Sequence, residues 1–389
     1  MKFKNILAGA TFLFLAILLF YKLGDNYLSN WDEAWYADIA RNMARTGNIL
    51  TPVFNQQPFF EKPPFYYWLS YLSFKAFSIN EFAARFPSAL AALGTGVVIF
   101  LLGKHLFNSR VGVSSVLILA STIGFLYRAR TGNLDSVLTF LILGTIYLFF
   151  IRRYVLMGIF VALAFLTKGF IAFLFPALAI FYLIMKRDKE LFNKKFITGV
   201  LIGILIPVVW VVLSIVLNGD TFIFQFFHNQ TEKFSGSASF WKNFSLDYLI
   251  FLKSGLKYWF VLFIPLVAYA LYKWRKSNQV LLSAFFLIYF GLLLFSRNKS
   301  NWFLMPLYPL TSLIIAWGIE EFRKKLKLSF AFMLLPVLFV SIFTLVKYRS
   351  EYLVPDIVTD EVNVARKAKE LTSERDTIYL TNYYYPTAI

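Results

Sequence analysis

The chain has 389 residues, of which 59% are hydrophobic and only 15% are charged. This composition excludes a disordered chain and argues against a soluble domain, because so few charged groups leave the surface of such a long chain mostly apolar. The net charge of +18 is typical of the Lys and Arg excess in cytoplasmic loops of membrane proteins, so it does not indicate a nucleic-acid-binding surface. The lack of cysteine excludes disulfides and thiol chemistry.

Eleven apolar segments follow one another along the chain, several of them near the lower limit of about 17 residues for a membrane-spanning helix. The sequence therefore predicts an all-α polytopic membrane protein with about 11 transmembrane helices, and 13 at most. The first segment lacks a small-residue cleavage site, so we interpret it as a membrane helix rather than a signal peptide. The segments are 5–23, 86–103, 111–127, 136–151, 154–168, 170–185, 196–217, 257–272, 279–296, 301–319 and 327–346.

Basic residues concentrate in every second connection between these segments. Because cytoplasmic loops are enriched in Lys and Arg, we place those connections and the N-terminus in the cytoplasm. With eleven spans the C-terminus then lies outside, and residues 1–346 form one transmembrane domain. The basic connections are 104–110, 152–153, 186–195, 273–276 and 323–327.

Two connections on the outer face, 24–85 and 218–256, are unusually long and are expected to form the functional site. The first carries apolar residues at helical spacing, which predicts amphipathic helices on the membrane surface. From residue 347 the chain becomes polar. Its pattern predicts a helix at 360–371 and a strand at 377–385, so residues 347–389 read as part of a small α/β domain outside the membrane.

The first outer connection contains two clusters suited to chemistry. Asn30 and Glu33 have the spacing of a helix capping box, which explains Glu33 well and its neighbour Asp32 only partly. Against that structural explanation, a carboxylate among aromatic residues beside a membrane span is costly and often functional. Further on, Lys62 precedes a Pro-Pro pair, where it either snorkels to the headgroups or holds a cation at the depth of a lipid phosphate.

Further polar residues lie at the predicted outer ends of later spans. Arg128 and Asp135 indicate either a pocket for an anion or an internal salt bridge. Lys168 stands alone in apolar sequence, Lys299 lies in a cationic turn, and a lone histidine such as His228 is more often a hydrogen-bonded surface residue than a metal ligand. Together these residues place carboxylates and cations on one face of the membrane, as an active site at the lipid surface requires.

Several common catalytic motifs are absent from the sequence. It contains no Gly-rich phosphate loop, no Gly-x-Ser-x-Gly elbow and no paired-His metal motif. Nucleotide chemistry of the soluble type and a serine hydrolase are therefore not predicted.

The order and spacing of six motifs resemble those of the membrane glycosyltransferases of the GT-C class. The resemblance is strongest to the aminoarabinose–lipid A transferases, which are distantly related to the protein O-mannosyltransferases, and it spans residues 5–320. The motifs are Asp32-Glu33-Ala34-Trp35-Tyr36-Ala37, Glu61-Lys62-Pro63-Pro64, Phe82-Ala83-Ala84-Arg85-Phe86-Pro87-Ser88, Leu134-Asp135, Phe165-Leu166-Thr167-Lys168-Gly169 and Ser296-Arg297-Asn298-Lys299.

The resemblance implies a GT-C fold and a sugar donor carried on a polyprenyl phosphate. It also implies a reaction on the periplasmic face of the bacterial inner membrane, without a nucleotide. It makes Asp32 the candidate base, with Glu33 and Asp135 as further catalytic carboxylates. The residues implied to contact the lipid phosphate are Lys62, Arg128, Lys233, Lys299 and Phe303. The acceptor remains open among a lipid, a glycan and a protein.

The resemblance also implies one divalent metal, Zn, Mg or Mn, held by Glu61 and His228. Two positions depart from the family pattern: Lys233 stands where Arg is usual, and Phe303 stands where a Tyr is usual. Both departures weaken the implied phosphate contacts.

Chemistry then suggests a mechanism. Departure of the sugar builds negative charge on the lipid phosphate, which Lys62 and neighbouring cations stabilise, while Asp32 activates the acceptor on the opposite face of the sugar and so inverts its configuration. Two other functions fit the same charges. One is a transporter or flippase of polyprenyl-linked lipids, which should show repeats or charged, broken helices near the bilayer midplane, and the other is a non-catalytic assembly subunit.

Overall fold

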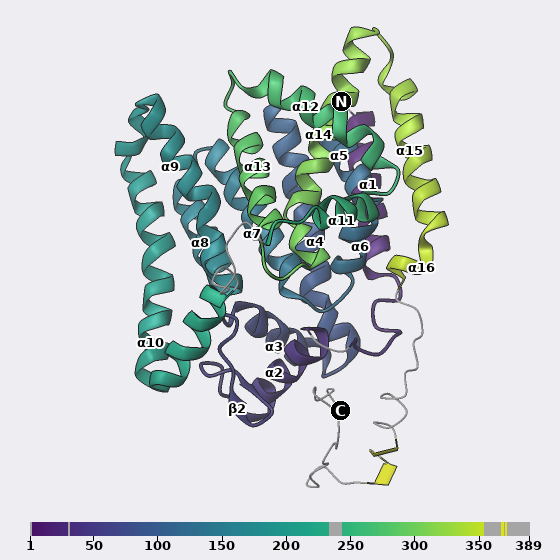
Figure 1. Cartoon of the computed structure of the whole chain (residues 1–389). Coiled ribbons are helices and arrows are strands. Elements are labelled where there is room, and N and C mark those ends of the chain that lie inside the picture. Colours follow the sequence, from purple (N-terminus) through teal and green to yellow (C-terminus); the bar gives the residue numbers. More distant parts are fainter. Residues whose placement is uncertain (1, 30–31, 233–242, 354–366, 369, 372–389) are drawn as a thin grey trace.

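The computed structural model describes residues 2–29, 32–232, 243–353, 367–368 and 370–371. It is a bundle of helices with a small cap at one end, formed by α2, α3 and a two-stranded hairpin (Figure 1). The elements are α1 (Lys2–Phe20), α2 (Asp32–Thr46), β1 (Val53–Phe54), β2 (Gln57–Pro58), α3 (Phe65–Phe77), α4 (Glu81–Leu106), α5 (Ser109–Ala120), α6 (Ile123–Ala129), α7 (Leu134–Phe150), α8 (Tyr154–Lys168), η1 (Gly169–Phe173), α9 (Leu174–Lys186), η2 (Lys189–Phe192), α10 (Lys194–Glu232), α11 (Asp247–Leu256), α12 (Trp259–Trp274), α13 (Val280–Leu294), η4 (Asn301–Leu304), α14 (Leu307–Lys325), α15 (Phe330–Lys347) and α16 (Arg349–Tyr352).

The all-helical prediction is confirmed, and a helix overlaps each of the eleven apolar segments. Fewer helices have the length and hydropathy of a membrane span. Within the described residues, four helices are long and apolar enough to cross a membrane, or up to six if each of two bent pairs counts as one span. One of the four, Tyr154–Lys186, comprises α8, η1 and α9. An ion pair of 2.9 Å joins Arg152 to Glu190, so the chain reverses direction at Gly169.

One predicted span, 111–127, is corrected by the structure. It is broken into α5 and α6, which meet at 71°. The reason lies in two hydroxyl residues at the break. Ser121 and Thr122 donate their hydroxyls to carbonyl oxygens of the preceding turn, and Ser121 also accepts a hydrogen bond from Trp259. Side-chain bonds of this kind compete with the backbone ladder and bend helices.

The predicted alternation of basic connections matches the course of the chain. The connections α4–α5, α7–α8, α9–α10, α12–α13 and α14–α15 all follow an odd number of passes from the cap, and Figure 1 shows the N-terminus and the α14–α15 connection at the end of the bundle opposite α2 and α3. The charges therefore gather away from the cap.

The cap confirms the helices that were predicted within 24–85. Between α2 and α3 the strands β1 and β2 pair antiparallel, and Asn55 and Gln56 at the turn both have positive φ, as a two-residue I′ turn requires. Tyr66 and Tyr67 of α3 are buried against the ring of Tyr36, at centroid distances of 5.5 and 5.6 Å. This aromatic packing joins α2 to α3. The helix predicted at 360–371 lies largely, and the strand predicted at 377–385 entirely, outside the described residues.

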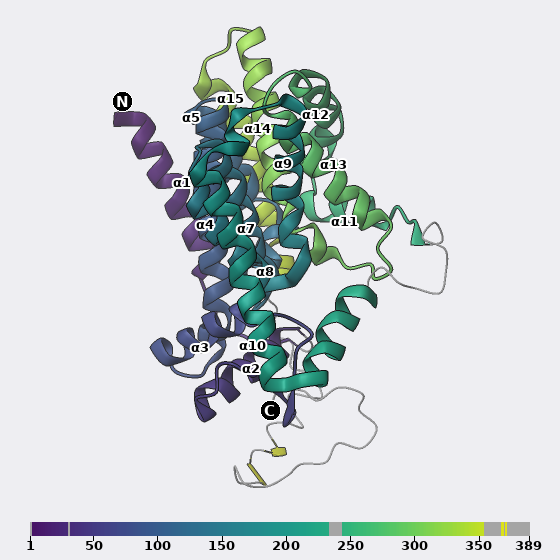
Figure 2. The same cartoon turned by 90° about the vertical axis from the view of Figure 1, so that its left-hand side faces the viewer.

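The helix α10 is divided by a bend at Gly219, whose φ of +52° and ψ of −133° are not helical. Figure 2 shows its two limbs meeting at a sharp angle. The predicted span 196–217 ends at this glycine, and the second limb turns beneath the bundle toward the cap.

Candidate functional site

A pocket of about 240 Å³, which we call the charged pocket, lies between the cap and the end of the bundle. Asp32 and Lys62, which the proposed chemistry requires to share a cavity, both line it. The full lining is Asp32, Tyr36, Glu61, Lys62, Leu134, Asp135, Lys168, Arg297, Asn298, Ser300, Trp302 and Phe303.

The charged side chains of this pocket come from the ends of elements. Asp32 begins α2 and Asp135 is the second residue of α7, whose N-cap Asn133 accepts a hydrogen bond from the backbone of Ser136. Lys168 ends α8, next to Gly169, whose φ of +78° is a conformation that glycine adopts without strain. Carboxylates at helix N-termini and a cation at a C-terminus also suit the helix dipoles.

Arg128, at the end of α6, links the two carboxylates of the pocket. Its Nη2 donates to Oδ2 of Asp32 at 2.8 Å and to Oδ2 of Asp135 at 2.9 Å. The guanidinium also lies 4.9 Å from the ring centroid of Trp302. Of the two alternatives that the sequence left open for Arg128 and Asp135, the internal salt bridge is present. Arg128 is not among the residues that line the charged pocket.

Asp135 is the buried centre of the network. Its side chain is 3% exposed, and its second oxygen accepts from Lys168, which lies 4.6 Å from the ring centroid of Phe303. The Asp32 side chain, by contrast, is 33% exposed. A carboxylate that two cations hold in place suits a positioning role, whereas the more open Asp32 can reach a substrate.

Lys62 adds a further cation to the lining of the pocket. Its ammonium lies 3.8 Å from Glu61, and burial, with Lys168 nearby, holds its pKa below the ordinary value of 10.5 despite that carboxylate. An ammonium in a desolvated place gains strongly from an anionic ligand. The position of Lys62 therefore fits capture of a phosphate.

The turn that carries Lys62 is held from the second limb of α10. Gln225 accepts a hydrogen bond from the backbone N–H of Phe60 at 2.8 Å and donates to the carbonyl of Pro58 at 3.1 Å. The ring of Phe60 also packs edge-on against Phe222, with centroids 5.2 Å apart. The α10 limb therefore fixes the backbone two residues before Lys62, a relationship that the sequence gave no signal to detect.

Glu33 occupies a different environment from the one that a catalytic carboxylate needs. It is buried and bonded to Arg85 of α4 at 2.7 Å, and it also accepts hydrogen bonds from the backbone N–H groups of Ser29 and Gly132. Burial alone would raise the pKa of Glu33, but Arg85 and these donors hold it below the ordinary value of 4.5. Glu33 does not line the charged pocket, so its predicted catalytic role is replaced by the structural one.

Lys299 is a second correction. Its ammonium donates to the carbonyls of Asn243 at 2.9 Å and Leu294 at 2.8 Å, which ties the loop to the end of α13, and it does not line the pocket. Arg297, two residues earlier in the same predicted cluster, does line it. Phe303 is placed in the pocket as predicted, and Lys233 lies outside the described residues.

The two implied metal ligands are not brought into one pocket. Glu61 lines the charged pocket, while His228 is exposed on α10, where its ring stacks on Phe224 at 5.0 Å. Among the described residues, no group of three His, Asp or Glu side chains is arranged to hold a metal. The residues present do not fit the implied metal, so we derive no step through one.

Tyr36 was missed as a pocket residue. It lies one helical turn after Asp32, so the two side chains share a face of α2. Burial, with Asp32 nearby, raises its pKa well above 10, so its hydroxyl stays protonated and can donate a hydrogen bond. The i, i+4 spacing of Asp32 and Tyr36 was the available signal.

Comparisons with known proteins show which families the chain resembles. A family model described as dolichyl-phosphate-mannose-protein mannosyltransferase matches residues 61–214. An uncharacterized protein of Aquifex aeolicus is 32% identical over 333 residues, which cover 84% of this chain and 77% of that protein. An undecaprenyl phosphate-alpha-4-amino-4-deoxy-L-arabinose arabinosyl transferase of Pseudomonas fluorescens is 32% identical over 272 residues, covering 63% of this chain and 49% of the transferase.

A solved structure shares the fold. The crystal structure of ArnT from Cupriavidus metallidurans bound to undecaprenyl phosphate superposes with a TM-score of 0.70 at 23% identity, covering 81% of this chain and 60% of that one. The chain spans less than two thirds of the length of most of the curated relatives that it matches.

Proposed function

Because the chain belongs to the superfamily of GT-C membrane glycosyltransferases that includes the aminoarabinose–lipid A transferases and the protein O-mannosyltransferases, we propose that it transfers a sugar from a polyprenyl-phosphate donor to an acceptor. The observation that carries this proposal is the charged pocket, which Asp32 and Lys62 line together. The proposed location is the inner membrane of a bacterium, with the pocket on the periplasmic side.

On the donor side, the lipid phosphate lies against Lys62. When the bond between C1 of the sugar and the phosphate oxygen breaks, its electron pair stays on the phosphate, and polyprenyl phosphate leaves with one more negative charge. Fixed cations stabilise that charge without reorganising during the reaction. Lys62 and Arg297 both line the pocket where this charge forms, and Lys168, already paired with Asp135, adds to the positive field.

On the acceptor side, Asp32 acts as the general base. The oxygen of an acceptor hydroxyl forms the new bond to C1 from the face opposite the leaving phosphate, and its proton passes to the Asp32 carboxylate. Attack from the opposite face inverts the configuration at C1. Arg128 donates a hydrogen bond to Oδ2 of Asp32 and so fixes the carboxylate at the wall of the pocket.

The position of the charges favours an enzyme over a transporter. Asp135 and Lys168 lie at the ends of α7 and α8, beside the cap, rather than in the middle of those helices. A transport pathway needs its charged residues near the bilayer midplane.

The experiment that tests the proposal uses the purified chain in liposomes with a polyprenyl-phosphate sugar, where water takes the sugar in place of the acceptor hydroxyl. Released polyprenyl phosphate is measured by mass spectrometry, with the Asp32→Asn variant as the matched control. We expect time-dependent release from the wild type and none above background from the variant. Movement of intact donor between leaflets without release would instead support the transporter.

A further inference from the structure

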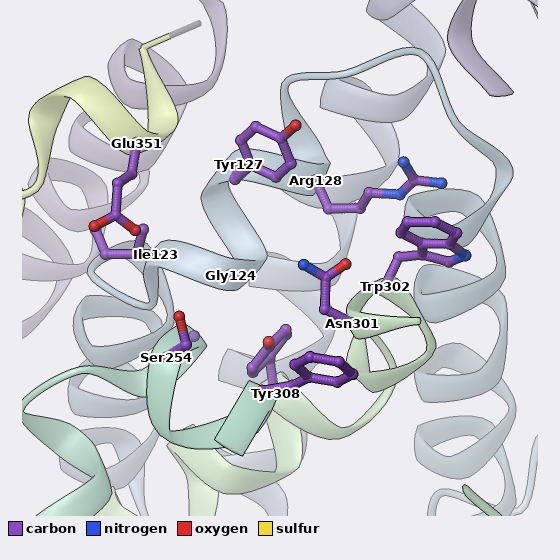
Figure 3. Close-up of a pocket in the computed structure, with 11 residues that line it drawn as sticks. Ile123, Gly124, Tyr127, Arg128, Ser254, Asn301, Trp302, Tyr308 and Glu351 are labelled. Carbon is purple, nitrogen blue, oxygen red and sulfur yellow. The ribbon is translucent and has the colours of Figure 1, made fainter. Parts of the chain in front are cut away.

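A second pocket, of about 320 Å³, adjoins the charged pocket, and we call it the aromatic pocket. Trp302 lines both pockets, and Arg128, whose guanidinium lies 4.9 Å from the Trp302 ring centroid, lines the aromatic pocket while it holds Asp32 and Asp135. The wall between the two cavities is therefore formed in part by Arg128 and Trp302. Figure 3 shows these two side chains next to each other at the edge of the aromatic pocket.

Both charged residues that line the aromatic pocket already form ion pairs. Its charged lining residues are Arg128, which pairs with two carboxylates, and Glu351, which pairs with Lys257 at 2.8 Å. A ligand that carried its own charge would have to compete with these pairs or remain uncompensated at partial burial. The lining therefore favours an uncharged ligand.

The neutral groups of the pocket combine two kinds of chemistry. Trp302, Tyr127 and Phe251 offer aromatic rings, while Ser254 and Asn301 offer a hydroxyl and an amide. Figure 3 shows Ser254 and Asn301 facing the same open space as Tyr308. Rings that pack against C–H groups, with a few well-placed hydrogen-bonding groups beside them, match a saccharide, which presents apolar C–H faces and a rim of hydroxyls.

Two glycines give this pocket its shape. A Cβ on Gly124 or on Gly255 would lie 2.4 or 2.2 Å from the hydroxyl oxygen of Tyr308, so only glycine leaves the Tyr308 ring in its present place. The volume lies at the lower end of the range of about 300–1,000 Å³ for ligand pockets, which suits a sugar headgroup better than a long peptide.

We propose that the aromatic pocket binds the acceptor, and that the acceptor carries an uncharged saccharide rather than a phosphate at this position. This inference rests on the proposed function. The donor phosphate occupies the charged pocket, the acceptor saccharide lies across the Arg128–Trp302 wall, and one of its hydroxyls reaches Asp32. That oxygen bonds to C1 of the donor sugar, its proton goes to Asp32, and polyprenyl phosphate leaves.

The test supplies three acceptor probes to the chain in liposomes with a polyprenyl-phosphate sugar. The probes are octyl glucoside, its 6-phosphate ester and a serine-containing peptide. Two rates are measured: release of polyprenyl phosphate without added acceptor, in which water takes the sugar, and formation of glycosylated probe. We expect transfer to octyl glucoside at a rate at least about tenfold above that to either other probe, a preference of ~1.4 kcal/mol.

Two substitutions at neighbouring positions localise the binding. Ser254→Trp places an indole in the aromatic pocket, and Lys253→Trp places the same group on the preceding residue of α11, which is exposed and does not line the pocket. We expect Ser254→Trp to reduce transfer at least about tenfold more than it reduces acceptor-free release, and Lys253→Trp to change neither. Asn301→Leu, at the exposed start of η4, should raise the acceptor KM more than it lowers release.

Each outcome decides between the proposals. Preference for the phosphorylated probe or for the peptide overturns the neutral saccharide. Equal loss of release and transfer in Ser254→Trp, with the elution profile of the wild type, assigns the pocket to the donor and overturns the acceptor site. No release and no transfer by the wild type overturns the proposed function itself.

Discussion

Arg128 holds Asp32 by a hydrogen bond of 2.8 Å between residues that are 96 positions apart in the chain. The bond ties the start of α2 in the cap to the end of α6 in the bundle. It leaves the Asp32 side chain one third exposed while fixing one carboxylate oxygen. The candidate base is therefore positioned by an element that also forms part of the wall of the aromatic pocket.

Asp32→Asn should abolish sugar transfer and leave membrane insertion intact. The amide keeps the shape of the side chain but cannot take the proton of the acceptor, and general-base catalysis contributes about 10²–10⁴-fold to rate. Activity is measured as release of polyprenyl phosphate, and folding as the elution profile of the detergent-solubilised protein. Activity within a few fold of the wild type would remove the assigned role of Asp32.

Donor affinity should fall at alkaline pH because Lys62 loses its proton. Burial holds the pKa of this ammonium below 10.5, so the cation loses its proton at a lower pH than an exposed lysine does. Only the protonated form attracts a phosphate. Donor affinity is therefore complete below the lowered pKa and declines as the pH rises through it.

Two variants of Lys62 check this dependence. Lys62→Arg stays protonated, so kcat/KM for the donor should remain constant to a higher pH than in the wild type. Lys62→Ala should raise the donor KM about 10–100-fold, as expected for loss of a hydrogen bond to a charged group. An unchanged donor KM in Lys62→Ala would place the phosphate elsewhere.

The helices could be predicted from the sequence because apolar runs identify them whatever their partners are. The break between α5 and α6 could not, because it depends on the contact between Ser121 and Trp259, which are 138 residues apart. The motifs identified Asp32 and Lys62 as site residues. The capping-box spacing explained Glu33 better than Asp32, yet Glu33 was still kept among the predicted catalytic carboxylates. Adjacent residues of a helix face directions about 100° apart, so one carboxylate reaches the pocket and the other meets Arg85.

In the loop before η4, the sequence likewise does not distinguish the basic residue that lines the pocket from the one that does not. Arg297 and Lys299 are both basic and two residues apart, and nothing local distinguishes them. The ammonium of Lys299 donates to a carbonyl at the end of α13. The last carbonyls of a helix have no backbone N–H partner within the helix and accept such donors. Arg297 is left to line the pocket.

Gln225 should act as a positioning residue for Lys62. Gln225→Leu removes both hydrogen bonds to the backbone at Pro58 and Phe60, each worth about 1 kcal/mol, so the donor KM should rise ~3–30-fold while kcat changes less. Gln225→Glu retains the acceptor of the Phe60 bond and should recover part of the loss. The matched control is Thr221→Leu, at an exposed position of the same limb. An equal fall of kcat in Gln225→Leu and in the control would indicate general damage to the limb instead.

Glu33→Gln should destabilise the fold more than it impairs chemistry. The substitution leaves Arg85 as a buried cation without its counter-charge, a change that costs about 3–5 kcal/mol, and the temperature of unfolding in detergent should fall accordingly. The pKa of Glu33 lies below the ordinary value of 4.5, so its charge stabilises the wild type above that pH, and this stabilisation is lost as the pH falls through the lowered pKa. The variant should lack this acid-dependent loss. A variant with wild-type unfolding temperature but no transfer would restore Glu33 to the catalytic carboxylates that the sequence suggested.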